Sequence, residues 1–439
     1  MSSPEPASGG PHGDDSADFL VVLPHLGLIQ RVLRGTQAGG SGPAATGVHA
    51  QELARSRDLG LARLGLDNVT EAARAIDARV EASQRAQDWL GKSGSRVPVD
   101  RPLDCVLSGL RALIATDYAG WTPTIGKNRL VGSVTGGGEV RFGGEVRFGG
   151  EVRFGGGPGP QLARGELRPR GAGPGRGVRV GVLDTKFAPQ PWLSGAWVAR
   201  YSDLLQDTDA RTAGMGHATF ITGLILSQAP GATVEVRTVL GTDGTADSWT
   251  VANAIVDFGR SGLDILNLSL LSYTEDDQPP LALSTAIDRL DPDIVVVAAS
   301  GNHGVVDDDY QRRRPAYPAA LDDVVAVGAG RPDGTLAPFT PSSAPWIDVQ
   351  AAGEDLVSTF LLGEVQVGES STGQPELVDF NGIARWSGTS FAAGLVSGAI
   401  AAGTDPGRVT ARQAWEDMQG ALGQRGSFPY LALDTATTW

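Results

Sequence analysis

The stretch VRVGVLDT, residues 178–185, is a run of branched apolar residues that ends in an aspartate. Four similar runs follow along the chain: TVEVRTVL (233–240), DILNLSL (264–270), DIVVVAA (293–299) and DVVAVG (323–328). Such runs of valine and isoleucine are typical of strands in a parallel sheet that is covered on both faces. Helix-like segments alternate with them, notably at 248–260 and 281–290. Residues 178–439 are therefore predicted to form a doubly wound α/β domain, a mostly parallel sheet with helices on both faces.

The region before this domain has different signals. Residues 1–18 are rich in Gly, Pro, Ser and Asp, which predicts a disordered tail. Residues 19–130 carry mostly helical patterns, clearest in DNVTEAARAIDARVEASQRAQDWLG (67–91) and again at 103–120. We expect a small, mainly helical N-terminal domain here, with a regulatory or substrate-recruiting role.

Capping residues set the expected bounds of the first of these helices. Asn68 and Glu71 have the spacing of a capping box at its start. Gly91 is a residue that commonly stops a helix. One unbroken helix is therefore predicted between them.

A Gly-rich segment, residues 131–177, separates the two regions and is predicted to be a linker. It contains three GGEVRF repeats, whose EVRF units lie at 139–142, 145–148 and 151–154. One interpretation is a flexible tether that was lengthened by replication slippage. The other is a self-processing site, because an extended Val-Arg-Phe segment can add as a strand to a sheet edge in a peptidase cleft. The sequence leaves both open.

Composition excludes some classes of function. The formal net charge is −14 and the isoelectric point is near 4.8, which argues against a binder of nucleic acid or of anionic membranes. Cys105 is the single cysteine, so the fold cannot depend on an internal disulfide. No basic leader and no long apolar run is present in the sequence. We expect a cytoplasmic protein.

Asp184 and His217 are the first two candidates for catalysis. Asp184 follows the strand-like run directly, and α/β folds place active sites at the carboxyl ends of such strands. An aspartate that only caps the next turn would look the same. His217 lies in GMGHATFITGLILSQA, at the start of an apolar helix, 33 residues further along (217 − 184). A buried histidine bonded only to backbone is the alternative for this residue.

Ser390 and Asn302 complete the set of candidates. Ser390 lies where the Gly-Thr-Ser turn of WSGTSFAAGLVSGAIAAG opens a helix, so backbone N–H groups and the helix dipole would face its oxygen. A serine at a helix start can also be a simple cap, although a cap leaves the surrounding Gly and Ala residues unexplained. These small residues predict close helix packing. Asn302 ends the run DIVVVAASGN and is either a turn residue or a donor to an oxyanion.

Four of these segments together resemble a known family. VRVGVLDT, HATFITG, VVVAASGNHG and WSGTSFAAGLVSGA are similar to the Asp, His, Asn and Ser motifs of the subtilisin-like serine peptidases. Their order Asp, His, Ser is that of subtilisin rather than of chymotrypsin or the α/β-hydrolases. The resemblance covers about 177–403 and implies a subtilisin-like fold.

The resemblance implies a role for each motif residue. Ser390 would attack the scissile carbonyl, His217 would take its proton, and Asp184 would support the imidazolium. Asn302 would bind the oxyanion together with the Ser390 N–H. Further residues would line the substrate cleft, one wall at Ser269, Leu270 and Leu271 and the other at Ala299, Ser300 and Gly301. Where this chain has Leu271 the family often has glycine, and we expect a narrower cleft.

The function predicted from these residues is that of a serine endopeptidase acting on peptide or protein substrates. We expect no cofactor and no metal, because neither Cys105 nor the histidines form a spaced cluster. A protein partner acting through the N-terminal domain is expected, although that domain does not resemble the inhibitory propeptide of secreted members. Two alternatives remain: a catalytically inactive peptide-binding protein of this fold, and a hydrolase of another kind, which would need a G-x-S-x-G elbow where this chain has GTSFA.

Overall fold

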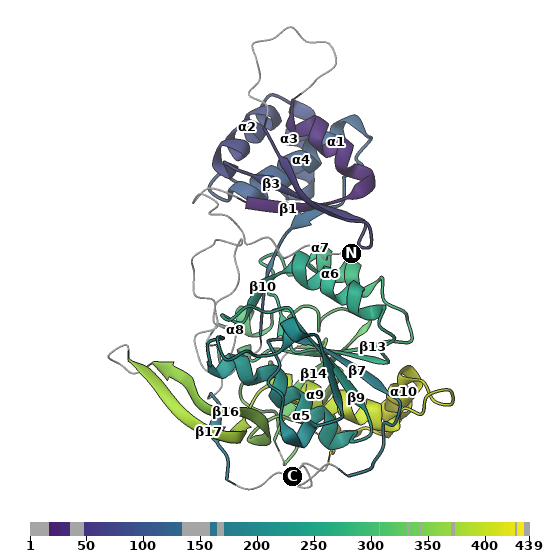
Figure 1. Ribbon diagram of the computed structural model, residues 1–439. Coiled ribbons are helices and arrows are strands. Elements are labelled where there is room, and N and C mark those ends of the chain that lie inside the picture. The colour runs from purple at the N-terminus through teal and green to yellow at the C-terminus, as the bar shows by residue number, and fades with distance from the viewer. Residues whose placement is uncertain are drawn as a thin grey trace. The chain divides into compact units, whose positions relative to one another are not determined.

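The computed structural model describes residues 17–35, 48–133, 159–164, 171–306, 308–331, 333–342, 344–369, 374–425 and 428–433. The chain forms two compact units that divide between Arg129 and Leu130. Helices and strands are labelled in Figure 1.

The first unit contains a four-stranded antiparallel sheet and four helices in its described residues. The strands are β1 (Ala17–Val22), β2 (Gln51–Ser56), β3 (Leu61–Leu66) and β4 (Ile125–Lys127), in the order β2-β3-β1-β4. The helices are α1 (Leu26–Leu33), α2 (Val69–Glu81), α3 (Gln84–Ser93) and α4 (Pro102–Asp117). This is the β-α-β-β-α-β arrangement of ferredoxin-like folds, with α2 to α4 in the place of its second helix. Phe19 and Val21 of β1 are buried in one core with Ile76 and Leu110.

Some bounds in this unit differ from the prediction. Asn68 does cap α2, because its side chain accepts a hydrogen bond from the backbone N–H of Glu71 at 2.9 Å. The expected single helix is broken at Ser83, which caps α3 separately. Gly91 lies inside α3, and the chain leaves the helix at Gly94, whose φ of 64° favours glycine.

The sheet of the first unit was not predicted. Ala17 and Asp18, assigned from the sequence to a disordered tail, belong to β1, whereas residues 1–16 lie outside the described part of the chain. Helices contain most of the regular structure in this unit, but its core is built on the strands. The short β2 has an alternating, largely polar sequence, QELARS, which carries little apolar signal.

The second unit is built on a nine-stranded sheet, in the order β18-β19-β15-β14-β13-β11-β7-β9-β8. Neighbouring strands are parallel except for the pair β18–β19. The strands are β7 (Arg179–Asp184), β8 (Trp197–Ala199), β9 (Thr233–Thr238), β11 (Ile265–Leu268), β13 (Val295–Ala299), β14 (Val324–Gly330), β15 (Val349–Ala352), β18 (Gly423–Arg425) and β19 (Phe428–Leu431). The five predicted apolar runs become β7, β9, β11, β13 and β14, which confirms the doubly wound, mostly parallel fold.

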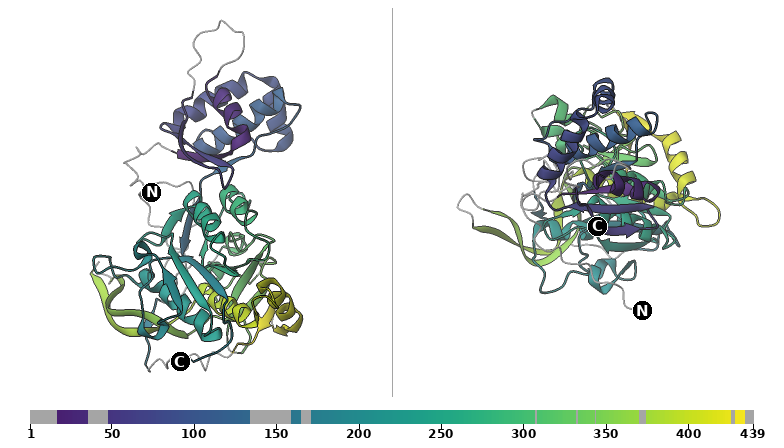
Figure 2. Two further views of the ribbon diagram at one scale, coloured as in Figure 1. Left: turned by 45° about the vertical axis from the view of Figure 1, so that its right-hand side comes forward. Right: turned by 90° about the horizontal axis from the view of Figure 1, so that it is seen from above.

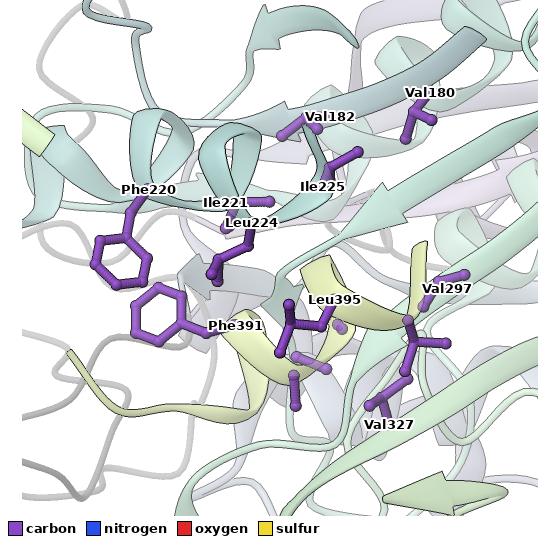
Figure 3. Close-up of a cluster of buried hydrophobic side chains, with 14 of the residues drawn as sticks. Val180, Val182, Phe220, Ile221, Leu224, Ile225, Val297, Val327, Phe391 and Leu395 are labelled. Carbon is purple, nitrogen blue, oxygen red and sulfur yellow. The ribbon is translucent and has the colours of Figure 1, made fainter. Parts of the chain in front are cut away.

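Helices cover both faces of this sheet. They are α5 (His217–Gln228), α6 (Ser248–Gly259), α7 (Leu281–Ile287), α8 (Asp309–Arg312), α9 (Thr389–Gly403) and α10 (Ala411–Ala421). Val180 and Val182 of β7 face the core that α5 and α9 share (Figure 3). Gly181 points to the other face, where an added methyl group would touch the ring of Phe258 in α6 at 3.0 Å. Successive residues of β7 therefore pack alternately against the helices on one face of the sheet and on the other.

Two smaller sheets complete the unit. One is a long hairpin of β16 (Leu356–Glu369) and β17 (Pro375–Trp386), extended by β6 (Gln161–Leu162). This hairpin lies on the opposite side of the unit from α10 (Figures 1 and 2). The other is formed by β10 (Thr245–Asp247), β5 (Leu130–Ser133) and β12 (Leu270–Leu271), with β5 in the middle. The described ends of the predicted linker therefore pair with strands of the second unit, while the EVRF repeats lie outside the described residues.

Helices α5 and α9 approach each other closely through glycines. A methyl group on Gly398 would lie 2.6 Å from the carbonyl oxygen of Ile225, and one on Gly394 would lie 3.4 Å from the side chain of Ile221. The first distance is too short for any carbon, so Gly398 has no room for a side chain. The close packing predicted from the small residues after Ser390 is present.

Replacing Gly398 with alanine should therefore destabilise the protein. Alanine normally stabilises a helix interior by about 0.5–1 kcal/mol relative to glycine. In Gly398→Ala the clash with Ile225 should outweigh this and lower the free energy of unfolding by about 1–3 kcal/mol. Gly420→Ala in α10 is the matched control, because nothing lies within 4 Å of its added methyl group. Urea unfolding should move the two midpoints in opposite directions. Equal shifts would contradict the packing argument.

Candidate active site

The carboxylate of Asp184 holds the imidazole of His217. Asp184 is the last residue of β7 and His217 is the first residue of α5. The Nδ1 atom lies 2.9 Å from each carboxylate oxygen. Both side chains are completely buried, and the Thr185 N–H donates to the same carboxylate at 2.7 Å. Because a carboxylate accepts, Nδ1 of the neutral ring carries the proton and Nε2 is the acceptor.

The second ring nitrogen of His217 lies in an aromatic surrounding. Nε2 is buried and has no hydrogen-bond partner among the described residues. The ring centroid is 5.7 Å from that of Trp386 and 5.4 Å from that of Phe391, the residue after Ser390. A buried nitrogen without a partner is unusual in folded proteins and calls for an explanation. The two aromatic residues were not singled out from the sequence, because nothing in their local pattern distinguishes them from core residues.

Ser390 is the second residue of α9 and is buried. At this position it lies at the positive end of the helix dipole. Its backbone carbonyl accepts a hydrogen bond from the Ser269 hydroxyl at 3.1 Å. The helix start is therefore tied directly to the chain segment that leads into β12.

A buried polar chain continues from this contact. Asn267 of β11 donates to the Ser269 hydroxyl at 2.9 Å, and Ser397 of α9 donates back to Asn267 at 3.0 Å. All three side chains are buried. The chain holds α9 at two points, one at Ser390 in its first turn and one at Ser397, about two turns further along. Sequence analysis missed Asn267 and Ser397, although an asparagine inside the apolar run DILNLSL was a usable signal.

The amide of Asn302 has a fixed orientation. Its Oδ1 accepts hydrogen bonds from both the N–H and the hydroxyl of Thr389, each at 3.0 Å. The amide nitrogen Nδ2 must therefore be on the other side. It lies beside Gly388, where an added methyl group would be 3.5 Å from it. The arrangement places an N–H donor next to the turn that carries Ser390.

The residues predicted to form the two walls of the cleft are all buried. On one wall, Leu270 and Leu271 form β12. On the other, Ala299 ends β13, and the chain continues through Ser300 and Gly301 to Asn302. The walls contact each other, because a methyl group on Gly301 would lie 3.1 Å from the Leu271 side chain. The role of these six residues in binding substrate stays a prediction.

His303, the residue after Asn302, is buried and held in its neutral form. The ring of His303 is buried, with Nε2 3.2 Å from the Arg314 carbonyl oxygen and Nδ1 2.7 Å from the Tyr273 hydroxyl. A carbonyl only accepts, so Nε2 carries the proton and Tyr273 donates to Nδ1. Burial lowers the pKa of His303 to about 4. Burial also raises the pKa of Tyr273, so both groups are neutral near pH 7.

Strand β5 occupies the edge next to Ser390. Gly132 pairs with Leu271 and Ser133 with Leu270, both antiparallel. On its other side β5 pairs with β10, and the Ser133 N–H donates to the Gly244 carbonyl at 2.8 Å. Because Ser269 precedes Leu270 and contacts Ser390, β5 runs toward Ser390 in its amino-to-carboxyl direction. Nothing in the four-residue sequence LVGS indicated this.

Other kinds of site were sought in the described parts of the chain. No three His, Cys, Asp or Glu side chains are grouped there as a metal site requires. No helix in those parts is long and apolar enough to cross a membrane.

The fold and the Asp184–His217 pair beside a serine at a helix start define a hydrolase of the serine peptidase class. The model of the Subtilase family matches residues 175–421, more than half of the 439 residues. The chain belongs to the subtilase family and is a serine endopeptidase. The resemblance inferred from the four motifs is thereby confirmed.

Individual relatives are distant. Subtilisin BL from Lederbergia lenta is 30% identical over 195 residues, which are 42% of this chain and 67% of that protein. A thermophilic serine proteinase from Bacillus sp. (strain AK1) is 29% identical over 265 residues, 57% of this chain and 59% of that protein. Among solved structures, a lanthipeptide protease is 23% identical with a TM-score of 0.47, covering 59% of this chain and 84% of that chain.

The state of His303 predicts a pH dependence of stability. The ring is neutral in the folded chain down to about pH 4, whereas in the unfolded chain it takes up a proton near its ordinary pKa of 6.5. The unfolded state therefore binds more protons between these values, and stability should fall as the pH drops from about 6.5 to 4. At pH 4.5 the loss from this group should be about 2 kcal/mol.

His303→Gln tests this, because glutamine does not titrate. Urea unfolding of both proteins at pH 7.5 and pH 4.5 should show a loss that is smaller in the variant by about 2 kcal/mol. A Ser390→Ala background prevents digestion during the measurement. Equal losses in the two proteins would show that His303 does not titrate as inferred.

Proposed function

We propose that Asp184, His217 and Ser390 act as one catalytic triad that hydrolyses peptide bonds through an acyl-enzyme. The observation that carries the proposal is the buried hydrogen bond between His217 and Asp184, which leaves Nε2 unpaired in the described residues, next to the turn that carries Ser390. His217 would take the proton of the serine hydroxyl as the hydroxyl attacks, and later give it to the leaving amine. Asp184 would stabilise the imidazolium formed between these steps.

Asn302 would complete the site as an oxyanion donor. Thr389 binds its Oδ1, and its Nδ2, which lies beside Gly388, would donate to the carbonyl oxygen of a substrate. The Ser390 N–H, at the start of α9, would be the second donor. Both donors are held in place before the charge develops, which is the condition for this kind of stabilisation.

A fluorophosphonate probe tests the activated serine. The purified chain should be labelled at Ser390, and Ser390→Ala should remove the label completely, because the reagent needs an activated nucleophile. Asp184→Asn should slow labelling by a factor on the order of 10⁴, since His217 would then hold the wrong tautomer. Mass spectrometry of tryptic peptides identifies the labelled residue. A folded chain that stays unlabelled even when Gly132→Pro removes β5 from the edge would favour the inactive, peptide-binding alternative.

The segment that follows the N-terminal unit would restrain this activity. β5 lies between β10 and β12 with antiparallel pairing on both sides, which is how an extended peptide adds to a sheet edge. Its direction toward Ser390 is that of a substrate approaching the nucleophile. We infer that β5 competes with substrates for this edge, and that a protein partner bound to the first unit could regulate the enzyme by withdrawing β5.

Gly132→Pro should release the cleft. Proline has no N–H for the ladder and is excluded from central strands, so β5 should leave the edge. The full chain should then cleave a fluorogenic peptide at least about tenfold faster, because RT ln 10 is only about 1.4 kcal/mol, close to one or two strand hydrogen bonds. Gly171→Pro is the matched control, in an exposed position with nothing within 4 Å of an added methyl group. Equal rates in the two variants would refute restraint by β5.

Two further parts of the proposal follow from the same strand and from the composition. The linker that carries the EVRF repeats, residues 139–154, would be cut by the enzyme itself, since β5 runs toward Ser390. Comparing the intact mass of the purified chain with that of Ser390→Ala tests this cleavage.

The enzyme would work inside the cell, because Cys105, buried in the first unit, leaves no disulfide that needs an oxidising compartment. Fractionation of the source cells tests this location.

A further inference from the structure

One substrate side chain would enter between the two predicted walls of the cleft and decide the specificity of cleavage. In an antiparallel pair, opposite residues point to the same face and successive residues alternate. In β5, Gly132 is opposite Leu271. In a substrate peptide bound in the place of β5, the residue two positions after the one at Gly132 would be opposite Ser269. Its side chain would point to the same face of the sheet as Leu271. Ser269 bonds to the Ser390 carbonyl, so that peptide residue would lie next to Ser390. Its side chain must fit between Ser269 and the segment at Ala299–Gly301.

Three side chains crowd the wall at Gly301. A methyl group on Gly301 would lie 3.1 Å from the Leu271 side chain, 2.8 Å from the Tyr273 hydroxyl and 2.8 Å from Nδ1 of His303. Leu271 and Tyr273 are two residues apart on one extended segment, so both reach the opposite wall from the same face. All three side chains are buried, with at most 3% exposure. The space beside Gly301 is therefore crowded by these three side chains.

The closure is held rigidly. The Tyr273 hydroxyl donates to His303 at 2.7 Å, and the other ring nitrogen is bonded to the Arg314 carbonyl. The two rings also meet edge to face, with centroids 4.9 Å apart. Opening the space would break this hydrogen bond and leave two buried polar groups unpaired, which typically costs about 1–3 kcal/mol for each group.

We propose that Leu271, Tyr273 and His303 shorten the specificity pocket, so that the enzyme cleaves after small residues such as Ala, Ser and Val and rejects Phe, Tyr and Arg in that position. The proposal rests on the proposed function of Ser390 and adds the class of substrate. It also bears on the repeats in the linker. Self-processing would use the glycine joints or the valines there, rather than the Arg and Phe residues of EVRF.

Peptides that differ only in the residue before the cleaved bond test the proposal. The full chain carrying Gly132→Pro should cleave the Ala peptide with a kcat/KM at least about 100-fold above that of the Phe peptide. Leu271→Ala should lower this ratio at least about tenfold by opening the pocket. Leu193→Ala, which shortens a buried leucine elsewhere in the core, should leave the ratio unchanged. A ratio does not depend on the fraction of folded enzyme, so loss of stability in either variant does not affect it.

The outcomes separate this proposal from the proposed function. Labelling of Ser390 by the fluorophosphonate with equal cleavage of the Ala and Phe peptides would overturn the short pocket and keep the peptidase. So would labelling without cleavage of the Ala peptide. Absence of labelling would overturn the proposed function itself. If Leu271→Ala does not fold, Leu271→Val should still raise the Leu-peptide rate relative to the Ala-peptide rate, and no change in that ratio would count against the proposal.

Discussion

The contact between α5 and α9 is the constraint on which the site depends. One helix begins with His217 and the other carries Ser390 in its first turn, so the separation of the two helices sets the separation of these two residues. Gly398 allows the α9 backbone to lie against the carbonyl of Ile225, as close as two helices can pack. Because protein interiors are densely packed, a side chain inserted at Gly398 would displace the first turns of α5 and α9. Gly398, a core position about two turns from Ser390, therefore helps to set the geometry of the site.

Polar groups buried beneath the site add a second constraint. Asn267, Ser269 and Ser397 bond to one another across β11 and α9, and Thr389 holds Asn302 in the same way. Their net contribution to stability is small, since each replaces a bond to water. Leaving one unpaired would be costly, so the network tolerates a single arrangement. Apolar residues would fill the same space but would allow α9 to slide. The polar chain fixes the register of α9, and with it the position of Ser390.

The parts that could be predicted share a local cause. Strand β7 and Asp184 were predicted because a valine-rich run and the residue that ends it lie next to each other in the chain. The meeting of Asp184 and His217 followed from the general rule on strand ends in parallel sheets. β5 could not be predicted, because four residues have no period and its partners are more than a hundred residues away. The bond between Tyr273 and His303 was missed for the same reason. Each is an ordinary polar residue in its own segment, and only the fold brings Tyr273, two residues after β12, next to the first residue of η5 (His303–Val305).

The covalent connection between β5 and the rest of the second unit would strengthen the restraint proposed for β5. A strand tethered to the cleft by its own chain competes at an effective concentration on the order of millimolar for a short connection, which a dilute substrate does not match. A cut between residues 134 and 158 would separate β5 from the second unit and turn the competition into an ordinary bimolecular one. The strand pairing itself would be unchanged, yet its advantage over substrate would depend on the protein concentration. Restraint and release would therefore come from one covalent connection, with no conformational change in the catalytic residues.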